Sequence, residues 1–177
     1  MKVLILAYPG TGKSYLAEHY ENVSDFEFQH YRYDYGKYKD LPLEQLKGRE
    51  DIRTPKKDYP ENFFKDLEKE LELREIVCVP MATSIFPILD CLKSKDVRII
   101  FAIRNEESFN DLINDYIKRG STTEFIERRK HDFDKFYKIV QETNFEKMIL
   151  DRNEYLADGI IKLGIPLKAG KGYKNYK

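Results

Sequence analysis

The chain has 177 residues, the length of a single domain, and its 31 basic residues balance its 31 acidic residues. With 41% hydrophobic and 35% charged residues it has the composition of a globular protein, and the zero net charge excludes a global basic field for nucleic acid. The start MKVLILAYPG is too short for a signal peptide, and no apolar run reaches membrane-spanning length. Because Cys78 and Cys91 form no CxxC pair, we interpret both as reduced thiols and expect a cytoplasmic protein without a membrane partner.

Apolar runs alternate with helical patterns along the chain. In chain order the patterns predict a strand over 2–8, a helix over 13–20, a strand over 25–29, a helix over 61–73, a strand over 75–82, a helix over 84–93, a strand over 97–104, helices over 106–119 and 121–142, a strand over 146–152 and a helix over 154–164. Ser121 and Glu124 match a capping box at the start of one helix. The alternation is typical of an α/β fold with a mostly parallel sheet. We expect one domain over 1–166 and a flexible basic tail over 167–177.

The segment AYPGTGKS (7–14) matches the phosphate-binding pattern [AG]-x4-G-K-[ST] at Ala7, Gly12, Lys13 and Ser14. It follows a predicted buried strand and opens a predicted helix, which is the context that a P-loop requires. The glycines let backbone N–H groups converge on one anion, Lys13 reaches the β- and γ-phosphates, and Ser14 can bind Mg²⁺. The predicted ATP-binding residues are Pro9, Gly10, Thr11, Gly12, Lys13, Ser14 and Tyr15.

A second ligand for Mg²⁺ is missing from its usual place, because the apolar run EIVCVPMATS carries no Asp at its end. The guanine-binding pattern NKxD is missing as well. Asp25, next to the second predicted strand, is the best substitute as a metal ligand or as a base for a substrate hydroxyl. Glu27 lies two residues further on, on the same side of that strand. A solvated turn explains Asp25 equally well.

A phosphotransferase needs positive charge on the moving phosphoryl group, and the segment IKRGSTTEFIERRKH supplies arginines for it. Arg119 precedes Gly120 at a helix end, Arg129 lies on the apolar stripe of the next helix, and Arg128 lies on its flank. An arginine on an apolar face needs an anionic partner, which is either a phosphate or a carboxylate of the protein itself. We expect residues 119–142 to form a lid.

The stretch 31–58 is polar and rich in Tyr and Lys, and we interpret it as an insertion in the region that binds the acceptor. Tyr31, Tyr33 and Tyr35 would share one face of a strand, where they could stack on an acceptor base. A plain strand edge with half-buried tyrosines explains the same pattern. We favour the second interpretation because aromatic residues favour strands in general.

These pieces together resemble the small P-loop nucleotide-kinase-like proteins of phage and prophage genomes. The similar segments are YPGTGKSYLAEHYENVSDFEF, YPENFFKDL, YIKRGSTTEFIE, the pair Phe133 and Phe136, and ILDRNEYLAD, which span most of the chain. The resemblance implies an adenylate-kinase-like core, that is, a parallel five-stranded sheet flanked by helices with a small helical lid. It also implies ATP as donor and a nucleotide-sized acceptor.

By matching position, the resemblance assigns phosphate binding to residues 10–14, acceptor or metal binding to Asp25, and a lid role to Arg119. Arg128 and Arg129 stand where the resemblance leads us to expect apolar residues.

The sequence therefore predicts a phosphotransferase, a nucleoside monophosphate kinase that uses ATP and Mg²⁺ and acts on a nucleotide or nucleoside. Its predicted catalytic residues are Lys13, Asp25, Arg119 and Arg129, and its predicted metal ligands are Ser14 and Asp25. A nucleic acid is expected as a partner only through a 5′-hydroxyl end, as in polynucleotide kinases. Two alternatives stay open: a non-catalytic nucleotide-binding regulatory protein, and an ATPase that needs no acceptor.

Overall fold

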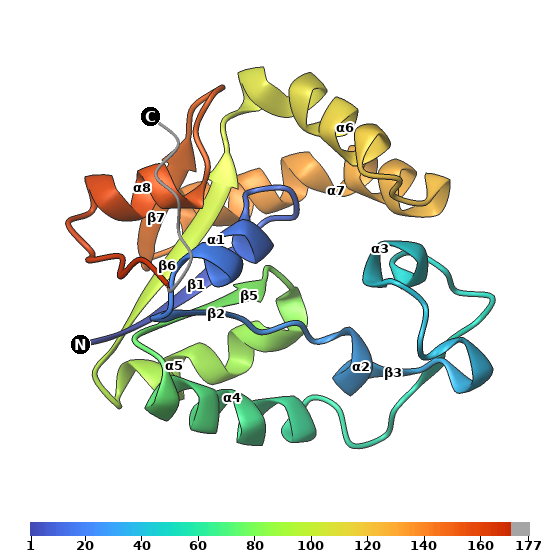
Figure 1. The fold of residues 1–177 in the computed structure, drawn as a ribbon, viewed down its shortest axis with the longest axis horizontal. Coiled ribbons are helices and arrows are strands. Elements are labelled where there is room, and N and C mark those ends of the chain that lie inside the picture. Colours follow the sequence, from blue (N-terminus) through green and yellow to red (C-terminus); the bar gives the residue numbers. More distant parts are fainter. Residues whose placement is uncertain (171–177) are drawn as a thin grey trace.

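The computed structural model describes residues 1–170, and a parallel sheet runs through their centre (Figure 1). Its strands are β1 (Lys2–Ala7), β2 (Val23–Asp25), β5 (Ile76–Pro80), β6 (Val97–Arg104) and β7 (Glu146–Leu150). They pair in the order β2-β5-β1-β6-β7, and every pair is parallel. The expected α/β fold with a parallel five-stranded sheet flanked by helices is therefore confirmed.

Helices cover both faces of this sheet. They are α1 (Lys13–His19), α4 (Glu61–Leu73), α5 (Leu89–Lys93) preceded by the 3₁₀ turn η2 (Thr83–Ile88), α6 (Phe109–Lys118) preceded by η3 (Glu106–Ser108), α7 (Thr123–Glu142) and α8 (Leu156–Lys162). Leu4 and Leu6 of β1 pack toward α4, α5, α6 and α7, whereas Val3 and Ile5 pack toward α1 and α8. Strand β1 is a continuous apolar run because its alternating side chains are buried on both faces.

Strand β2 is shorter than predicted and ends at Asp25, so the expected strand over 25–29 is wrong. Phe26 and Phe28 leave the sheet and pack their rings against Phe63 of α4, with centroids 5.2 and 6.4 Å away. The alternation of aromatic and acidic residues that suggested a strand therefore reflects burial against a helix. Because the sheet ends here, Asp25 lies at the carboxyl end of β2.

The predicted capping box of Ser121 and Glu124 is wrong, because α7 is capped one residue later, by Thr122 alone. Thr122 is the N-cap of α7, and its Oγ1 accepts a hydrogen bond from the Phe125 amide at 3.2 Å. The Ser121 hydroxyl instead donates to Glu44 Oε2 at 2.8 Å. Both hydroxyl residues suit an N-cap, and a tertiary contact that local sequence does not encode decides between them.

The segment between β2 and α4 forms a small lobe beside the sheet. Its elements are α2 (Gln29–Arg32), β3 (Tyr33–Asp34), the 3₁₀ turn η1 (Gly36–Tyr38), α3 (Leu43–Leu46) and β4 (Thr54–Pro55), with β3 and β4 antiparallel. Tyr33, Tyr35 and Leu46 form a separate buried cluster, while Tyr31 packs against Phe63. The expected strand face shared by the three tyrosines is wrong, because β3 is two residues long and Tyr31 belongs to α2.

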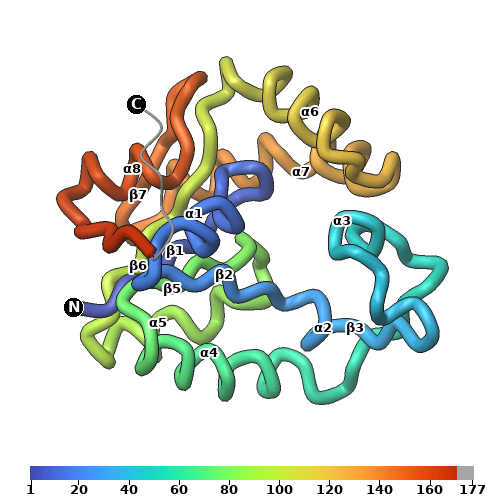
Figure 2. Tube along the Cα trace, viewed as in Figure 1, coloured from blue at the N-terminus to red at the C-terminus, as the bar shows by residue number. Residues whose placement is uncertain are grey.

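The small lobe contacts the body of the protein at the start of α7, where α3 and α7 lie close together (Figure 2). The Thr122 hydroxyl donates to the carbonyl oxygen of Lys47 at 2.7 Å. We call the contact between residues 44–50 and 119–128 the clasp. It joins the region expected to bind an acceptor to the region expected to form a lid.

The last described residues are held against the body of the protein. Glu21 donates its backbone amide to the carbonyl of Lys168, and the Lys168 amide donates to Asn22 Oδ1, both at 2.9 Å. The tail that we expected to be flexible from residue 167 is therefore anchored over 167–170. Its remaining part, 171–177, lies outside the described residues.

Replacement of Gly48 by alanine tests the packing of the clasp. Gly48 has φ +83°, and a Cβ there would lie 2.7 Å from the Phe125 backbone nitrogen. We expect Gly48→Ala to lower the free energy of unfolding by about 2–4 kcal/mol, through backbone strain and overpacking together. Gly120→Ala is the control, since its φ of +76° carries the strain but nothing lies within 4 Å of the added methyl group. Urea unfolding that shows equal losses for the two variants would contradict close packing at Gly48.

Candidate functional site

The loop between β1 and α1 takes the shape that its glycines allow. Gly10 and Gly12 have φ values of +83° and +101°, in the region that favours glycine. Space also limits position 10, because a Cβ on Gly10 would lie 2.4 Å from a methyl carbon of Leu112. The Thr11 hydroxyl is buried and donates to the Tyr8 carbonyl at 2.8 Å, which fixes the turn. This strand, glycine turn and helix follow one another as the sequence pattern predicts.

A cavity of about 480 Å³ opens in front of this loop. Its walls come from residues 9–15, from 27–53, from 80–83 at the end of β5, and from residues between 119 and 136. Eight of the lining side chains are basic and three are acidic. The basic side chains are Lys13, Arg32, Lys47, Arg53, Arg119, Arg128, Arg129 and Lys135. An excess of positive charge inside a concave site favours an anionic ligand.

Lys13 is the central cation of this cavity, and two carboxylates hold its ammonium group. Its Nζ lies 3.0 Å from Glu27 Oε1 and 3.6 Å from Asp25 Oδ1, and 9% of the Lys13 side chain is exposed. Burial lowers the pKa of Lys13, but the charges of Glu27 and Asp25 outweigh it, so this pKa lies above its ordinary value. Burial likewise raises the pKa of Glu27, and Lys13 and Lys47 together bring it below its ordinary value. Lys13 and Glu27 are therefore both charged at neutral pH.

Asp25 connects Lys13 to Ser14, the residue that the motif assigns to a metal ion. The Ser14 hydroxyl donates to Asp25 Oδ2 at 2.7 Å. Asp25 Oδ1 and Glu27 Oε2 are buried acceptors without a hydrogen-bond partner within residues 1–170. Buried oxygens in this state suit a cation or a hydrogen-bond donor.

A magnesium ion fits these oxygens, because it takes oxygen ligands and usually keeps several of its waters. Ser14 and Asp25 would supply the one or two protein ligands that such a site needs. In the described part of the chain, no group of three or more His, Cys, Asp or Glu side chains converges into a metal-binding cluster.

The arginines predicted for the lid line the same cavity as Lys13. Arg119 lies 3.7 Å from Glu44 and over the ring of Tyr116. Arg129 pairs with Asp132 at 2.9 Å, and its Nε is buried without a hydrogen-bond partner among the described residues. Each of these two arginines thus has the expected anionic partner, and in this structure the partner is a carboxylate of the protein itself.

Arg128 also lines the cavity, and it pairs with Glu50 at 2.6 Å across the clasp. Its side chain is 35% exposed, against 12% for Arg129. The interpretation that Arg129 lies on the apolar stripe of the helix and Arg128 on the flank agrees with these exposures. Both side chains are within reach of a ligand that fills the cavity.

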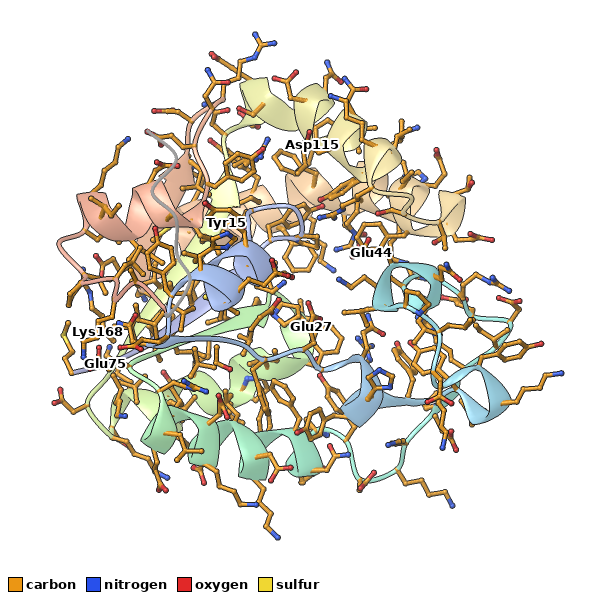
Figure 3. All side chains as sticks on the ribbon, in the orientation of Figure 1. Tyr15, Glu27, Glu44, Glu75, Asp115 and Lys168 are labelled. Carbon is orange, nitrogen blue, oxygen red and sulfur yellow. The ribbon has the colours of Figure 1, made fainter. Side chains whose placement is uncertain are left out.

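Three basic side chains of the small lobe were missed by sequence reasoning. Arg32, Lys47 and Arg53 all line the cavity, and Lys47 Nζ lies 3.6 Å from the Glu27 carboxylate that also holds Lys13. Figure 3 shows Glu27 beside the sheet and Glu44 on the α3 side. A signal was present in the sequence, since basic residues recur among the tyrosines of 31–58. Their convergence on the P-loop depends on how the lobe folds back, which no spacing reveals.

Arg104 is a further buried cation that the sequence reasoning did not single out. It ends β6, it is 1% exposed, and its Nη1 lies 3.4 Å from Asp115. Its guanidinium also lies over the ring of Tyr155, and Tyr155 in turn is the side chain nearest to Gly12 of the P-loop. The sequence signal that could have identified Arg104 is its position at the end of an apolar strand, where a charged residue is expected to be buried.

Comparison of the chain with protein-family models, with curated proteins and with solved structures finds no match. The geometry of the site is thus the basis for any functional statement. Within residues 1–170, none of the helices combines the length and the apolar character needed to cross a membrane.

A Glu27→Gln variant tests whether the buried carboxylate stabilises Lys13. Because the pKa of Glu27 is lowered in the folded protein, its contribution is present above the unfolded pKa and disappears as the pH falls through the folded value. We expect the variant to be about 2 kcal/mol less stable than the wild type at pH 7, and we expect a smaller difference at about pH 3, below the ordinary pKa of Glu. Urea unfolding at both pH values measures this.

Glu68→Gln is the matched control, because Glu68 forms an ion pair with Lys95 at the surface. We expect less than about 0.5 kcal/mol from its loss. A Glu27→Gln variant that is as stable as the wild type at pH 7 would show that the Lys13 ammonium does not depend on Glu27.

Proposed function

We propose that this protein is an ATP-dependent phosphotransferase that acts on a nucleotide or nucleoside, that is, a nucleotide kinase. The observation that carries the proposal is the buried Lys13 ammonium, which faces a basic cavity from a glycine turn between a buried strand and a helix. This arrangement suits a phosphate group held by converging backbone N–H groups and a lysine. The strand order and the flanking helices are compatible with the adenylate-kinase-like core that the sequence resemblance implies.

The cavity has the dimensions and charge for more than one phosphate. Lys13 lies at the end formed by the P-loop, while Arg119, Arg128 and Arg129 approach from α7 and the turn before it. In the proposed reaction an acceptor oxygen bonds to the γ-phosphorus of ATP as the bond to the β–γ bridging oxygen breaks, and ADP leaves. These cations would balance the charge that spreads over the moving phosphoryl group.

Ser14 and Asp25 would hold a magnesium ion on the ATP phosphates, and the ion would supply further neutralisation of their charge. Asp25 ends β2, and its buried Oδ1 accepts no hydrogen bond from a described residue and lies 3.6 Å from Lys13 Nζ, which supports the proposal. When the acceptor is a hydroxyl, as at the 5′ end of an oligonucleotide, Asp25 or Glu27 would accept its proton.

A second candidate is a nucleotide-binding protein that transfers no phosphate to an acceptor, either a regulatory protein or a plain ATPase. The end of β5 favours it, because residues 80–83 line the cavity without a carboxylate. Many P-loop enzymes place a magnesium-binding Asp on a strand of this kind.

Replacement of Lys13 by alanine tests the site itself. Calorimetric titration with Mg·ATP should give a dissociation constant at least about 30-fold weaker than that of the wild type, since charge-assisted contacts contribute about 2 kcal/mol. Lys65→Ala is the control, because Lys65 is exposed on α4 outside the cavity. Equal affinity of Lys13→Ala and wild type for Mg·ATP would overturn the assignment of the P-loop.

Transfer is tested with radiolabelled Mg·ATP and a panel of all ribo- and deoxynucleoside monophosphates, with nucleosides and a 5′-hydroxyl oligonucleotide included. We expect at least one labelled acceptor, and we expect Asp25→Asn and Arg119→Ala each to lower kcat about 100-fold. Bound ATP without any labelled acceptor would favour the second candidate. Hydrolysis that needs no acceptor and is lost in Lys13→Ala would then identify an ATPase.

A further inference from the structure

Gln29 lines the cavity on the wall that the small lobe provides, at the first position of α2. Its side-chain carbonyl Oε1 accepts a hydrogen bond from the Tyr35 hydroxyl at 2.9 Å. Its amide nitrogen Nε2 makes no hydrogen bond to the part of the chain that the structure describes. The amide therefore has one end attached to the protein and its donor end available.

The direction of the hydrogen bond to Gln29 follows from a third residue. Tyr35 is 2% exposed and is packed in the small cluster with Tyr33 and Leu46. The guanidinium of Arg53 lies over the ring of the adjacent Tyr33, and its positive charge acts on the Tyr35 hydroxyl. A positive charge beside a hydroxyl attracts the oxygen and repels the proton, so the Tyr35 proton points to Gln29 Oε1. This hydrogen bond attaches the carbonyl end of the amide to the protein.

The surroundings of Gln29 offer donors and flat apolar surface. Arg32, one turn along α2, also lines the cavity and lies over the rings of Phe28 and Tyr33. Its guanidinium can only donate hydrogen bonds. Phe28, Tyr33 and Met81 line the cavity as well. Flat apolar surface beside a few fixed polar groups suits a nucleobase.

We infer that Gln29 is a specificity-determining residue, and that it selects an acceptor whose base carries a carbonyl oxygen at C6 of a purine or at C4 of a pyrimidine. Guanine has such an oxygen at C6, and uracil and thymine have one at C4. Adenine and cytosine carry an amino group at these positions, which would meet the Gln29 amide donor to donor and leave both groups unpaired. This inference rests on the proposed function, because it assumes that a nucleotide occupies the cavity.

Binding of nucleoside monophosphates tests the inference without requiring phosphoryl transfer. Calorimetric titration of the full-length protein, saturated with Mg·ADP, is carried out with GMP, UMP, dTMP, AMP and CMP. We expect the wild type to bind GMP or the UMP and dTMP pair at least about 10-fold more tightly than AMP and CMP, since a site built for one hydrogen-bond polarity rejects the other strongly. Equal affinities, or a preference for AMP or CMP, would overturn the inference.

Two variants separate the role of the amide from the shape of the site. Gln29→Glu replaces the donor by an acceptor of the same size, and we expect it to reverse the ratio of affinities in favour of AMP or CMP. Tyr35→Phe removes the hydroxyl that orients the amide without changing a residue that lines the cavity, and we expect the ratio to fall toward one. Unchanged ratios in both variants would overturn the inference.

Titration of the same samples with Mg·ATP distinguishes a failure of base selection by Gln29 from a failure of nucleotide binding at the P-loop. Mg·ATP affinity is expected to be the same in wild type and Tyr35→Phe, because Tyr35 does not line the cavity. If wild type binds Mg·ATP but none of the monophosphates, the inference about Gln29 fails and nucleotide binding at the P-loop stands. If Mg·ATP does not bind either, both fail. Should Tyr35→Phe fail to fold, as judged by circular dichroism, Gln29→Glu alone decides.

Discussion

The burial of one positive charge sets the arrangement of the candidate site. The Lys13 ammonium is removed from water, so it needs carboxylates close by, and Asp25 and Glu27 provide them from the end of β2. In the sheet, β5 lies between β1 and β2, and its Cys78 pairs in register with both Ile5 and Asp25. Burial raises the pKa of the Cys78 thiol to about 12, with Asp25 adding to the effect, so this residue stays a neutral spacer between the charged groups.

The same charges bear on how the cavity would accommodate the phosphate group of the proposed function. A phosphate group that binds Lys13 competes with Glu27 for the ammonium. Glu27 then still has Lys47 at 3.6 Å, so its carboxylate is not left buried and alone. The small lobe thus contributes a cation that keeps the acidic residue paired in either state. For Arg119 and Arg128 the small lobe supplies the opposite charge, because Glu44 and Glu50 pair with these arginines across the clasp.

The central sheet and the glycine turn between β1 and α1 could be predicted from the sequence because each is encoded locally. Continuous apolar runs specify the buried strands, and Gly10 and Gly12 allow the positive φ values of the turn. Elsewhere local patterns were ambiguous. Phe26 and Phe28 alternate with acids as a strand would, yet they pack against a helix, and Ser121 and Thr122 are both good helix caps. The wall formed by the small lobe depends on tertiary folding, so Arg32 and its neighbours could not be assigned to the site from spacing.

The clasp is held by polar contacts, whereas the rest of the structure is held by apolar packing, and this difference affects how a ligand would enter the cavity. The sheet and its helices share large apolar clusters, whereas residues 44–50 meet 119–128 through hydroxyls, ion pairs and one glycine contact. Ion pairs between partly exposed side chains such as Arg128 and Glu50 contribute at most about 1 kcal/mol each. Separation at the clasp therefore costs much less than any distortion of the sheet. Since Arg119 and Arg128 line the cavity, the same separation would remove the carboxylates of Glu44 and Glu50 from these two guanidinium groups.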